Sequence, residues 1–166
     1  MSPHKESIAV CPGTYDPVTN GHLDVIQRTA ALYDRVIVAV VNRSVRKSGA
    51  LFGIDERVAF IRNAVAGLEG VSVEPFSTLV VDFARRVGAK AIVKGLRAIS
   101  DFEYEIEMSQ LNRGQAPEIE SVYLMASPQY SFLSSSGVKE LATFGGRIDD
   151  LVPDEVASRL QEELRR

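Results

Sequence analysis

The sequence predicts an α/β domain built on a parallel β-sheet, and two observations lead to this fold class. Short β-branched, apolar segments alternate along the chain with segments of helical period. The strand-like segments are apolar throughout rather than at every second residue, which is typical of strands covered on both faces. Strand–helix–strand units of this length favour right-handed connections between parallel strands. We therefore expect one Rossmann-like, doubly wound domain with five parallel strands, helices on both faces of the sheet and a C-terminal helix.

The individual elements follow from the same two patterns. The predicted strands are 7–11, 36–41, 71–76, 89–95 and 121–126. In the segments between them apolar side chains recur every three or four residues, as Leu23, Ile26 and Ala30 do in the first, so one face of each helix is apolar. These predicted helices are 22–33, 55–67, 79–88, 101–113 and 134–145. A last helix is expected over 152–166, with Pro153 in its first turn, where proline is favoured.

The composition is that of a soluble globular protein. The chain has 166 residues, of which 45% are hydrophobic and 25% charged. The net charge of -3 gives no electrostatic reason to expect nucleic acid or an anionic membrane as the main partner. No apolar run approaches the roughly 20 residues of a membrane span, and the N-terminus does not read as a signal peptide. We expect a cytoplasmic protein in which residues 1–166 form a single domain and residues 1–6 are flexible.

The chain has one cysteine, Cys11, at the end of the first predicted strand. A single cysteine excludes an internal disulfide and a zinc site made of several cysteines. In an apolar strand it is expected to be a small buried side chain rather than a nucleophile. No cluster of metal-ligating residues is evident, so no protein-held metal site is predicted.

Ligands bind to doubly wound sheets at the carboxyl ends of the strands, where the strand order reverses. The segment after the first strand reads 11-CPGTYDPVTNGHLDV-25. Gly13 permits a tight turn, Thr14 offers a hydroxyl, and His22 stands where the next helix should begin. Because a helix N-terminus carries unpaired N–H groups and partial positive charge, this loop suits a phosphate group. A histidine at a helix start can also be a simple capping residue, so His22 alone does not decide between the two.

Two further clusters follow later strands. Lys94 and Arg97 lie three residues apart after the fourth strand and suit a triphosphate, although a solvated basic turn would show the same spacing. The acidic, aromatic stretch 101–107 comes next, and its carboxylates suit a ribose hydroxyl, Mg²⁺ or simply the first turns of a helix. After the fifth strand, Ser134, Ser135 and Ser136 precede a helical pattern; a plain serine cap explains one of them well and three poorly.

Together these stretches carry a family resemblance. G-T-Y-D-P followed by Thr19-Asn20-Gly21-His22 resembles the G-x-F-D-P and (H/T)-x-G-H motifs of the nucleotidyltransferase superfamily. TYDPVTNGH, KGLRAISDFEYE, MSQLNR and YSFLSSSGVKE are similar, in order and spacing, to the phosphopantetheine adenylyltransferase family. The resemblance extends from residue 7 to about residue 160.

The resemblance implies a reaction and its partners. The family transfers AMP from ATP to 4'-phosphopantetheine, which gives 3'-dephospho-coenzyme A and pyrophosphate in the penultimate step of coenzyme A biosynthesis. We expect in-line attack of the acceptor phosphate on the α-phosphate of ATP, with His22 and Lys47 stabilising the transition state. Mg²⁺ would be bound mainly through ATP. By resemblance the protein is expected to be a homohexamer, with coenzyme A as a feedback inhibitor.

The resemblance also carries residue roles to matching positions. His22 and Lys47 fall on the catalytic positions. Lys47 is placed through K-S-G-A-L-F in a loop, 42–52, that is longer than is typical of the family, so Arg46 and Arg43 are alternatives. The acceptor-binding positions are Thr14, Lys47, Leu79, Val80, Lys94, Tyr104, Asn112 and Glu140. The ATP-binding positions are Thr14, Tyr15, His22, Gly95, Leu96, Arg97, Glu105, Tyr130, Ser131, Phe132, Leu133, Ser134, Ser135 and Ser136.

Two other functions are weighed against this one. A sister nucleotidyltransferase, acting on nicotinate mononucleotide or with CTP on glycerol or choline phosphate, would share the first motif but not the later strings in this form. A nucleotide-binding module without chemistry should have lost some of the cationic or histidine positions, and none is missing here.

Overall fold

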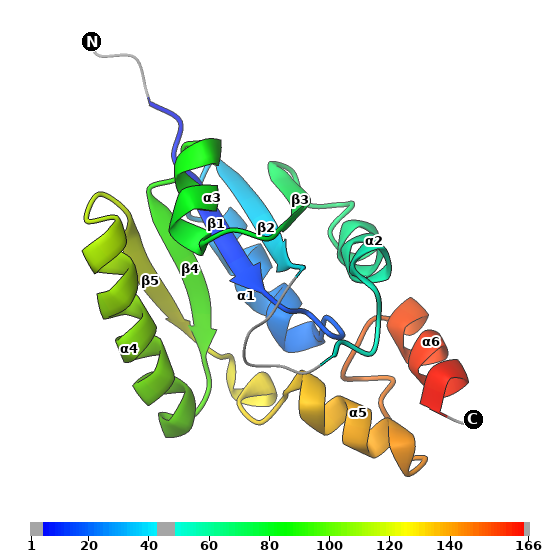
Figure 1. The fold of residues 1–166 in the computed structure, drawn as a ribbon. Helices are drawn as coiled ribbons and strands as arrows, with labels where there is room; N and C mark the ends of the chain where they lie inside the picture. The colour runs from blue at the N-terminus through cyan, green and yellow to red at the C-terminus, as the bar shows by residue number, and fades with distance from the viewer. Residues whose placement is uncertain (1–4, 43–48, 165–166) are drawn as a thin grey trace.

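The computed structural model describes residues 5–42 and 49–164, which form a five-stranded parallel sheet with helices on both faces (Figure 1). The expectation that residues 1–6 are flexible falls mostly outside these residues. The strands are β1 (Ile8–Gly13), β2 (Arg35–Val41), β3 (Val71–Phe76), β4 (Ala91–Leu96) and β5 (Glu120–Met125). Their order in the sheet is β3-β2-β1-β4-β5, and every neighbouring pair is parallel. The predicted fold class is confirmed.

The strand order reverses between β1 and β4, which lie side by side at the centre of the sheet. β1 leads outward to β2 and β3 on one side, and β4 leads to β5 on the other. The loops that leave the carboxyl ends of β1 and β4 therefore run in opposite directions. They leave between them the crevice in which doubly wound sheets bind ligands.

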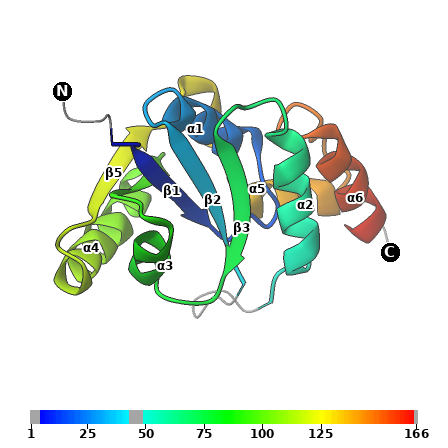
Figure 2. The ribbon, with the colours of Figure 1, turned by 90° about the horizontal axis from the view of Figure 1, so that it is seen from above.

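The helices cover the sheet in two layers, as Figure 2 shows from above. α1 (Asn20–Ala30) and α2 (Ile54–Ala64) pack on one face, and α3 (Val80–Val87) and the end of α4 (Ile99–Gln115) pack on the other. β2 shows why its whole sequence is apolar. Val36, Val38 and Val40 point into the first layer, whereas Ile37 and Ala39 point into the second.

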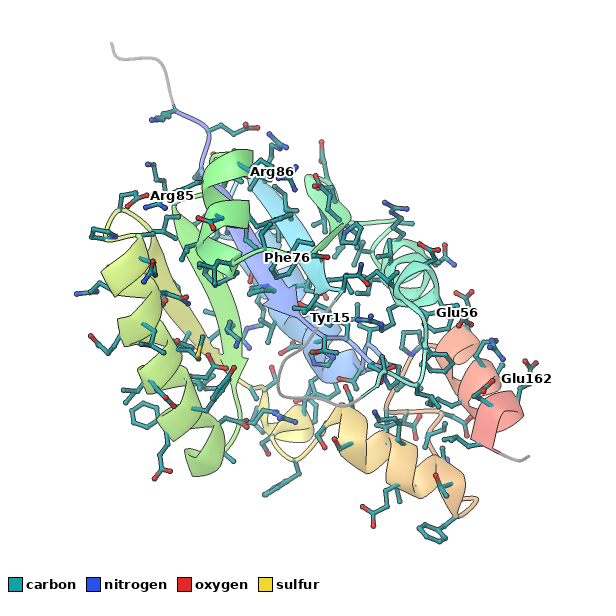
Figure 3. The ribbon with its side chains drawn as sticks, in the orientation of Figure 1. Tyr15, Glu56, Phe76, Arg85, Arg86 and Glu162 are labelled. Atoms are coloured by element: carbon teal, nitrogen blue, oxygen red, sulfur yellow. The ribbon has the colours of Figure 1, made fainter. Side chains whose placement is uncertain are left out.

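The last quarter of the chain returns to the α1 and α2 side of the sheet. A 3₁₀ turn, η1 (Pro128–Tyr130), leads into α5 (Ser135–Thr143), and α6 (Asp154–Leu164) packs against α5 and closes the core with Val156 and Leu160. Arg159 of α6 pairs with Glu56 of α2 at 2.9 Å and with Glu162 at 2.9 Å; both carboxylates are labelled in Figure 3. α6 is therefore part of the same body as the sheet.

The predicted elements are all present, with shifts of a few residues at their ends. α1 begins at Asn20 rather than at residue 22, because Thr19 already acts as its N-cap. α3 ends one residue earlier than predicted, at Val87, because Gly88 takes the left-handed conformation that terminates helices. The turn η1 was not anticipated. Within the described residues, no helix combines the length and the apolar character needed to cross a membrane.

The packing of α6 predicts that shortening its buried leucine unfolds the protein more easily. Leu160 is fully buried, so Leu160→Ala should lower the free energy of unfolding by about 2–5 kcal/mol, measured by urea denaturation. Leu32→Ala is the matched control, because Leu32 is 64% exposed and the same change there should cost less than about 0.5 kcal/mol. Equal losses at the two positions would show that α6 does not depend on this core.

Candidate functional site

A cavity of about 740 Å³ opens at the carboxyl ends of β1 and β4, where the strand order reverses. It is lined by residues from the loop after β1, from the start of α1, from the end of β4 and from α4. Twelve of the substrate- and ATP-binding positions that the family resemblance indicates line it: Thr14, Tyr15, His22, Leu79, Val80, Lys94, Gly95, Arg97, Tyr104, Glu105, Asn112 and Tyr130. The tertiary structure thus brings the sequence clusters together at the place that the fold class favours.

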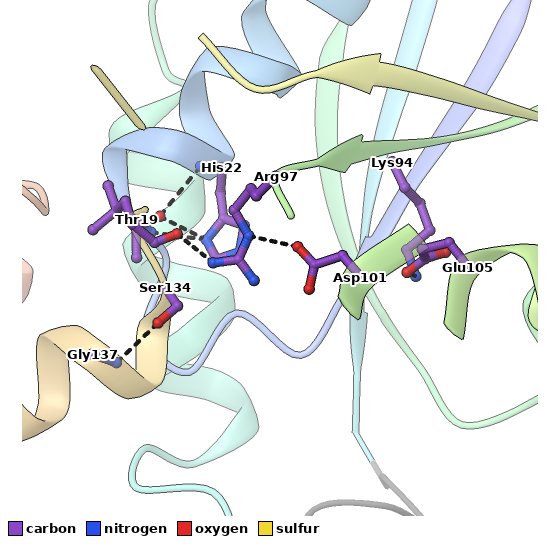
Figure 4. A network of polar contacts seen from close by, with 9 residues as sticks. Thr19, His22, Lys94, Arg97, Asp101, Glu105, Ser134 and Gly137 are labelled. Atoms are coloured by element: carbon purple, nitrogen blue, oxygen red, sulfur yellow. Dashed lines mark hydrogen bonds and ion pairs between the residues drawn. The ribbon is translucent and has the colours of Figure 1, made fainter. Parts of the chain in front are cut away.

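His22 is held by a reciprocal capping interaction at the start of α1 (Figure 4). The Thr19 side chain accepts a hydrogen bond from the His22 N–H at 3.3 Å, and His22 Nδ1 accepts one from the Thr19 N–H at 3.0 Å. Histidine here takes the place that Glu or Gln usually takes in a capping box. Because a backbone N–H can only donate, Nδ1 carries no proton, and the neutral ring carries its proton on Nε2. The cap therefore sets both the orientation and the tautomer of a histidine that lines the cavity.

Tyr15, labelled in Figure 3, supports the His22 ring from the loop after β1. Its ring meets the imidazole edge to face at a centroid distance of 4.9 Å, and its hydroxyl donates to the Cys11 carbonyl at 2.9 Å. Its φ of 51° is unusual for a residue with a side chain. A Cβ at Gly13 would lie 2.9 Å from the Tyr15 ring, so glycine is needed where this ring folds back over the strand end.

Lys94 and Glu105 form an ion pair inside the cavity. Lys94 Nζ lies 2.5 Å from Glu105 Oε1 and 5.7 Å from the centre of the Tyr104 ring. Glu105 Oε2 is buried and has no hydrogen-bond partner among the described residues. A buried carboxylate oxygen without a donor is costly, so this atom suits an N–H or O–H group of a ligand.

Arg97 connects the end of β4 to the segment 130–136 before and at the start of α5, here called the serine loop. Its Nε donates to Asp101 Oδ2 at 3.1 Å, and its Nη1 donates to the Leu133 carbonyl. Arg97 lines the same cavity as His22, and Figure 4 draws both residues. Arg97 is thus exposed to solvent, yet it links the end of β4 to α4 and to the loop before α5.

In the serine loop, the hydroxyls of Ser134 and Ser135 form hydrogen bonds within the protein. Ser134 caps α5 by accepting from the Gly137 N–H at 3.0 Å, and the Ser135 hydroxyl donates to the Pro17 carbonyl at 2.7 Å. The Ser135 hydroxyl thus connects α5 to the loop after β1. Tyr130 lines the cavity, whereas eight other residues named in the sequence do not: Leu96, Ser131, Phe132, Leu133, Ser134, Ser135, Ser136 and Glu140. Phe132 is fully exposed.

Lys47 and its alternatives Arg46 and Arg43 lie outside the described residues.

Two charged residues to which the sequence analysis gave no role are buried: Asp16 in the loop after β1, and Arg57 in α2. Asp16 stands in the G-T-Y-D-P string, and Arg57 precedes Val58 on the helical stripe that points to the core. A charged residue within an otherwise apolar helical stripe was the signal that could have identified Arg57 from the sequence.

Cys11 is buried, and its burial raises the pKa of the thiol to about 12. The thiol is therefore protonated at neutral pH and is no nucleophile, as expected. Among the residues that the structure describes, no group of three or more His, Cys, Asp or Glu side chains could hold a metal ion.

Comparisons with known proteins agree with the fold and with the motifs. Residues 10–141 match the model of the cytidylyltransferase-like family. The chain is 52% identical to the phosphopantetheine adenylyltransferase of Moorella thermoacetica, over 90% of this chain and 92% of that protein. It is 50% identical to the phosphopantetheine adenylyltransferase of Rubrobacter xylanophilus, over 94% of each chain.

Solved structures of lower identity share the fold. The nicotinic acid mononucleotide adenylyltransferase of Plasmodium falciparum, complexed with NaAD, superposes with a TM-score of 0.71 at 12% identity, over 95% of this chain and 96% of that one. A putative nicotinate-nucleotide adenylyltransferase from Vibrio parahaemolyticus superposes with a TM-score of 0.70 at 16% identity, over 98% and 96%. At these identities the likeness concerns the fold alone.

The raised pKa of Cys11 predicts an unreactive thiol in the folded protein. Because thiolate is the reactive form, Ellman's reagent at pH 8 should label almost no thiol in the native protein. The same protein in guanidinium chloride should give one equivalent, since Cys11 is the only cysteine. Prompt labelling of the native protein would show that the thiol is accessible and ionised.

Proposed function

The chain belongs to the phosphopantetheine adenylyltransferase family within the cytidylyltransferase-like proteins, and we propose that it transfers AMP from ATP to 4'-phosphopantetheine. The products are 3'-dephospho-coenzyme A and pyrophosphate. One observation carries this proposal beyond the family: His22, Lys94 and Arg97 converge on one cavity at the reversal point of the sheet. Such a site suits a ligand with several phosphate groups.

The proposed reaction is an in-line attack of the acceptor phosphate on the α-phosphorus of ATP. A phosphate monoester has a second pKa of about 6, so it is largely dianionic at neutral pH and needs no general base. The new oxygen–phosphorus bond forms as the bond to pyrophosphate breaks, and no covalent enzyme intermediate is required. The protein has to position the two substrates and stabilise the charge that develops on the α-phosphate oxygens.

His22 is suited to that stabilisation. Its capping contacts leave the proton on Nε2, and its ring lines the cavity, so Nε2–H can donate to a phosphate oxygen and keep its proton. Lys47 is proposed as a second catalytic cation on the sequence pattern, with Arg46 and Arg43 as alternatives. Arg97, the serine loop and the N-terminus of α5 are proposed for the β- and γ-phosphates of ATP.

The ion pair of Lys94 and Glu105 offers one partner to each substrate, a cation to the acceptor and a carboxylate to ATP. We propose that Lys94 binds the acceptor phosphate and that Glu105 accepts a hydrogen bond from ATP. The buried oxygen of Glu105, which has no partner among the described residues, supports this role because a donor from ATP would satisfy it. An incoming phosphate would also replace the carboxylate as the partner of Lys94.

The pantetheine arm needs a groove that is apolar with a few polar points. Leu79, Val80 and Met108 supply apolar lining to the cavity, and Tyr104 and Asn112 supply polar groups. We assign the arm to this part of the cavity. Glu140 remains a proposal on the sequence pattern, and its side chain lies outside the lining.

The remaining partners are proposed from the family. The described residues offer no cluster of metal ligands, so Mg²⁺ would be held mainly by ATP oxygens and water, where it neutralises phosphate charge. We further propose a cytoplasmic homohexamer that coenzyme A inhibits by occupying the arm groove.

The proposed function predicts which substrates react. With ATP, Mg²⁺ and 4'-phosphopantetheine the purified protein should release pyrophosphate. Nicotinate mononucleotide in place of the acceptor, or CTP in place of ATP, should lower kcat/KM by at least about 100-fold, because the site's buried polar groups would be left unpaired. Faster release with nicotinate mononucleotide would assign the chain to the sister reaction, and no release with any pair would favour a binding module.

The role of His22 predicts a loss in turnover rather than in binding. His22→Ala should lower kcat by about 100- to 1,000-fold, because it removes one donor to the transition state. The dissociation constant for ATP, measured by calorimetry, should change far less. His22→Gln is the matched variant, since its amide N–H reaches near the position of Nε2, and it should lose less activity than the alanine variant. A near-normal kcat for His22→Ala would remove His22 from the mechanism.

A further inference from the structure

We infer that Arg57 is a positioning residue for the reaction: its buried guanidinium holds the loop after β1 and both ends of the β2–α2 connection in one arrangement at the rim of the site. This inference rests on the proposed function. Arg57 does not line the cavity, so it acts through the backbone that it binds.

Arg57 reaches from the first turn of α2 to three carbonyl groups of three different segments. Its Nη1 donates to the Thr14 carbonyl at 2.7 Å and to the Val41 carbonyl at 2.9 Å, and its Nε donates to the Phe52 carbonyl at 3.0 Å. Thr14 follows β1, Val41 is the last residue of β2, and Phe52 shortly precedes α2. A guanidinium carries its donors in a fixed planar fork, so the three carbonyls are held in fixed directions.

Asp16 holds the same segment with the opposite charge. Its two carboxylate oxygens accept from the Leu51 N–H at 2.8 Å and the Phe52 N–H at 3.0 Å, and Lys139 of α5 lies 3.2 Å from Oδ2. Phe52 is therefore bound through its N–H by Asp16 and through its carbonyl by Arg57. Burial lowers the pKa of Arg57, and the nearby charge of Asp16 opposes that shift.

The backbone that Arg57 binds is adjacent to the residues proposed to contact the substrates. The carbonyl that Arg57 binds belongs to Thr14, whose side chain lines the cavity, and the next residue is Tyr15. The Tyr15 ring in turn packs against His22. A displacement of the Thr14 carbonyl would thus shift both a proposed ligand contact and the support of the catalytic histidine.

The burial of Arg57 also indicates a role beyond stability. Arg57 is 3% exposed, and its guanidinium donates to three neutral carbonyls rather than to a carboxylate. Burying a charge in this way is costly, and a well-packed apolar side chain usually stabilises a core at least as well. We infer that this planar fork of donors orders the loops beside the proposed phosphate site.

The test compares Arg57→Lys with Arg62→Lys. Arg62 lies on the same helix and also donates to a strand carbonyl, that of Val73 at 3.1 Å, but it is exposed and away from the cavity. Lysine keeps the charge of Arg57 and loses the fork. At saturating ATP and phosphopantetheine, Arg57→Lys should lower kcat about 10- to 100-fold with smaller changes in both KM values, because misplaced groups lower the rate of the chemical step. Arg62→Lys should stay within about twofold of the wild type in kcat.

A second measurement separates this inference from the proposed function. Hydrogen exchange at the Leu51 and Phe52 amides should accelerate at least about tenfold in Arg57→Lys and stay unchanged in Arg62→Lys. This readout stands even if the wild type releases no pyrophosphate, an outcome that would refute the proposed function instead. If Arg57→Lys does not fold, Asp16→Asn, which loosens Phe52 from its other side, is measured in the same way.

Three results would overturn the inference. The first is a kcat of the folded Arg57 variant within twofold of the wild type. The second is a loss of kcat that only follows the unfolded fraction, as determined from the denaturation curve. The third is unchanged amide exchange at Leu51 and Phe52.

Discussion

The polar groups of the loop between β1 and α1 must be paired inside the protein, and the rest of the site depends on this constraint. An unpaired polar group is costly once it is removed from water. The partners of this loop come from distant parts of the chain: Arg57 for the Thr14 carbonyl, the Leu51 and Phe52 amides for Asp16, and Ser135 for the Pro17 carbonyl. One short loop therefore joins β2, α2 and α5 at the carboxyl edge of the sheet.

The same pairing orders the chemistry of the cavity. Thr19 and His22 satisfy each other at the start of α1, and this leaves the imidazole with its proton on the nitrogen that the cap does not use. Lys94 and Arg97 are held by Glu105 and Asp101 at the end of β4. Two cations and two carboxylates therefore line the cavity as two ion pairs, Lys94 with Glu105 and Arg97 with Asp101.

Much of the fold was predictable because it rests on periodicity. Alternation of apolar strands with amphipathic helices is a local pattern, and it located the five strands and six α-helices of the described residues to within a few residues. Element ends were less predictable, since caps such as Thr19 and Gly88 decide them. The grouping of Thr14, His22, Lys94 and Arg97 around one cavity followed from the rule that ligands bind where the strand order of a parallel sheet reverses.

The sequence by itself determined the fold class, the family and the clusters after the first and fourth strands that meet at the cavity, because motifs and periods are properties of neighbouring residues. Only the tertiary structure decided what each polar group pairs with. It placed Ser134 and Ser135 in caps and loop contacts rather than on the cavity wall, and it left one oxygen of Glu105 without a partner among the described residues. It also made Arg57, which by spacing is one charge on a helix, the buried donor to carbonyl groups of three separate segments. Such partners are far apart in the chain and meet only when the sheet is assembled.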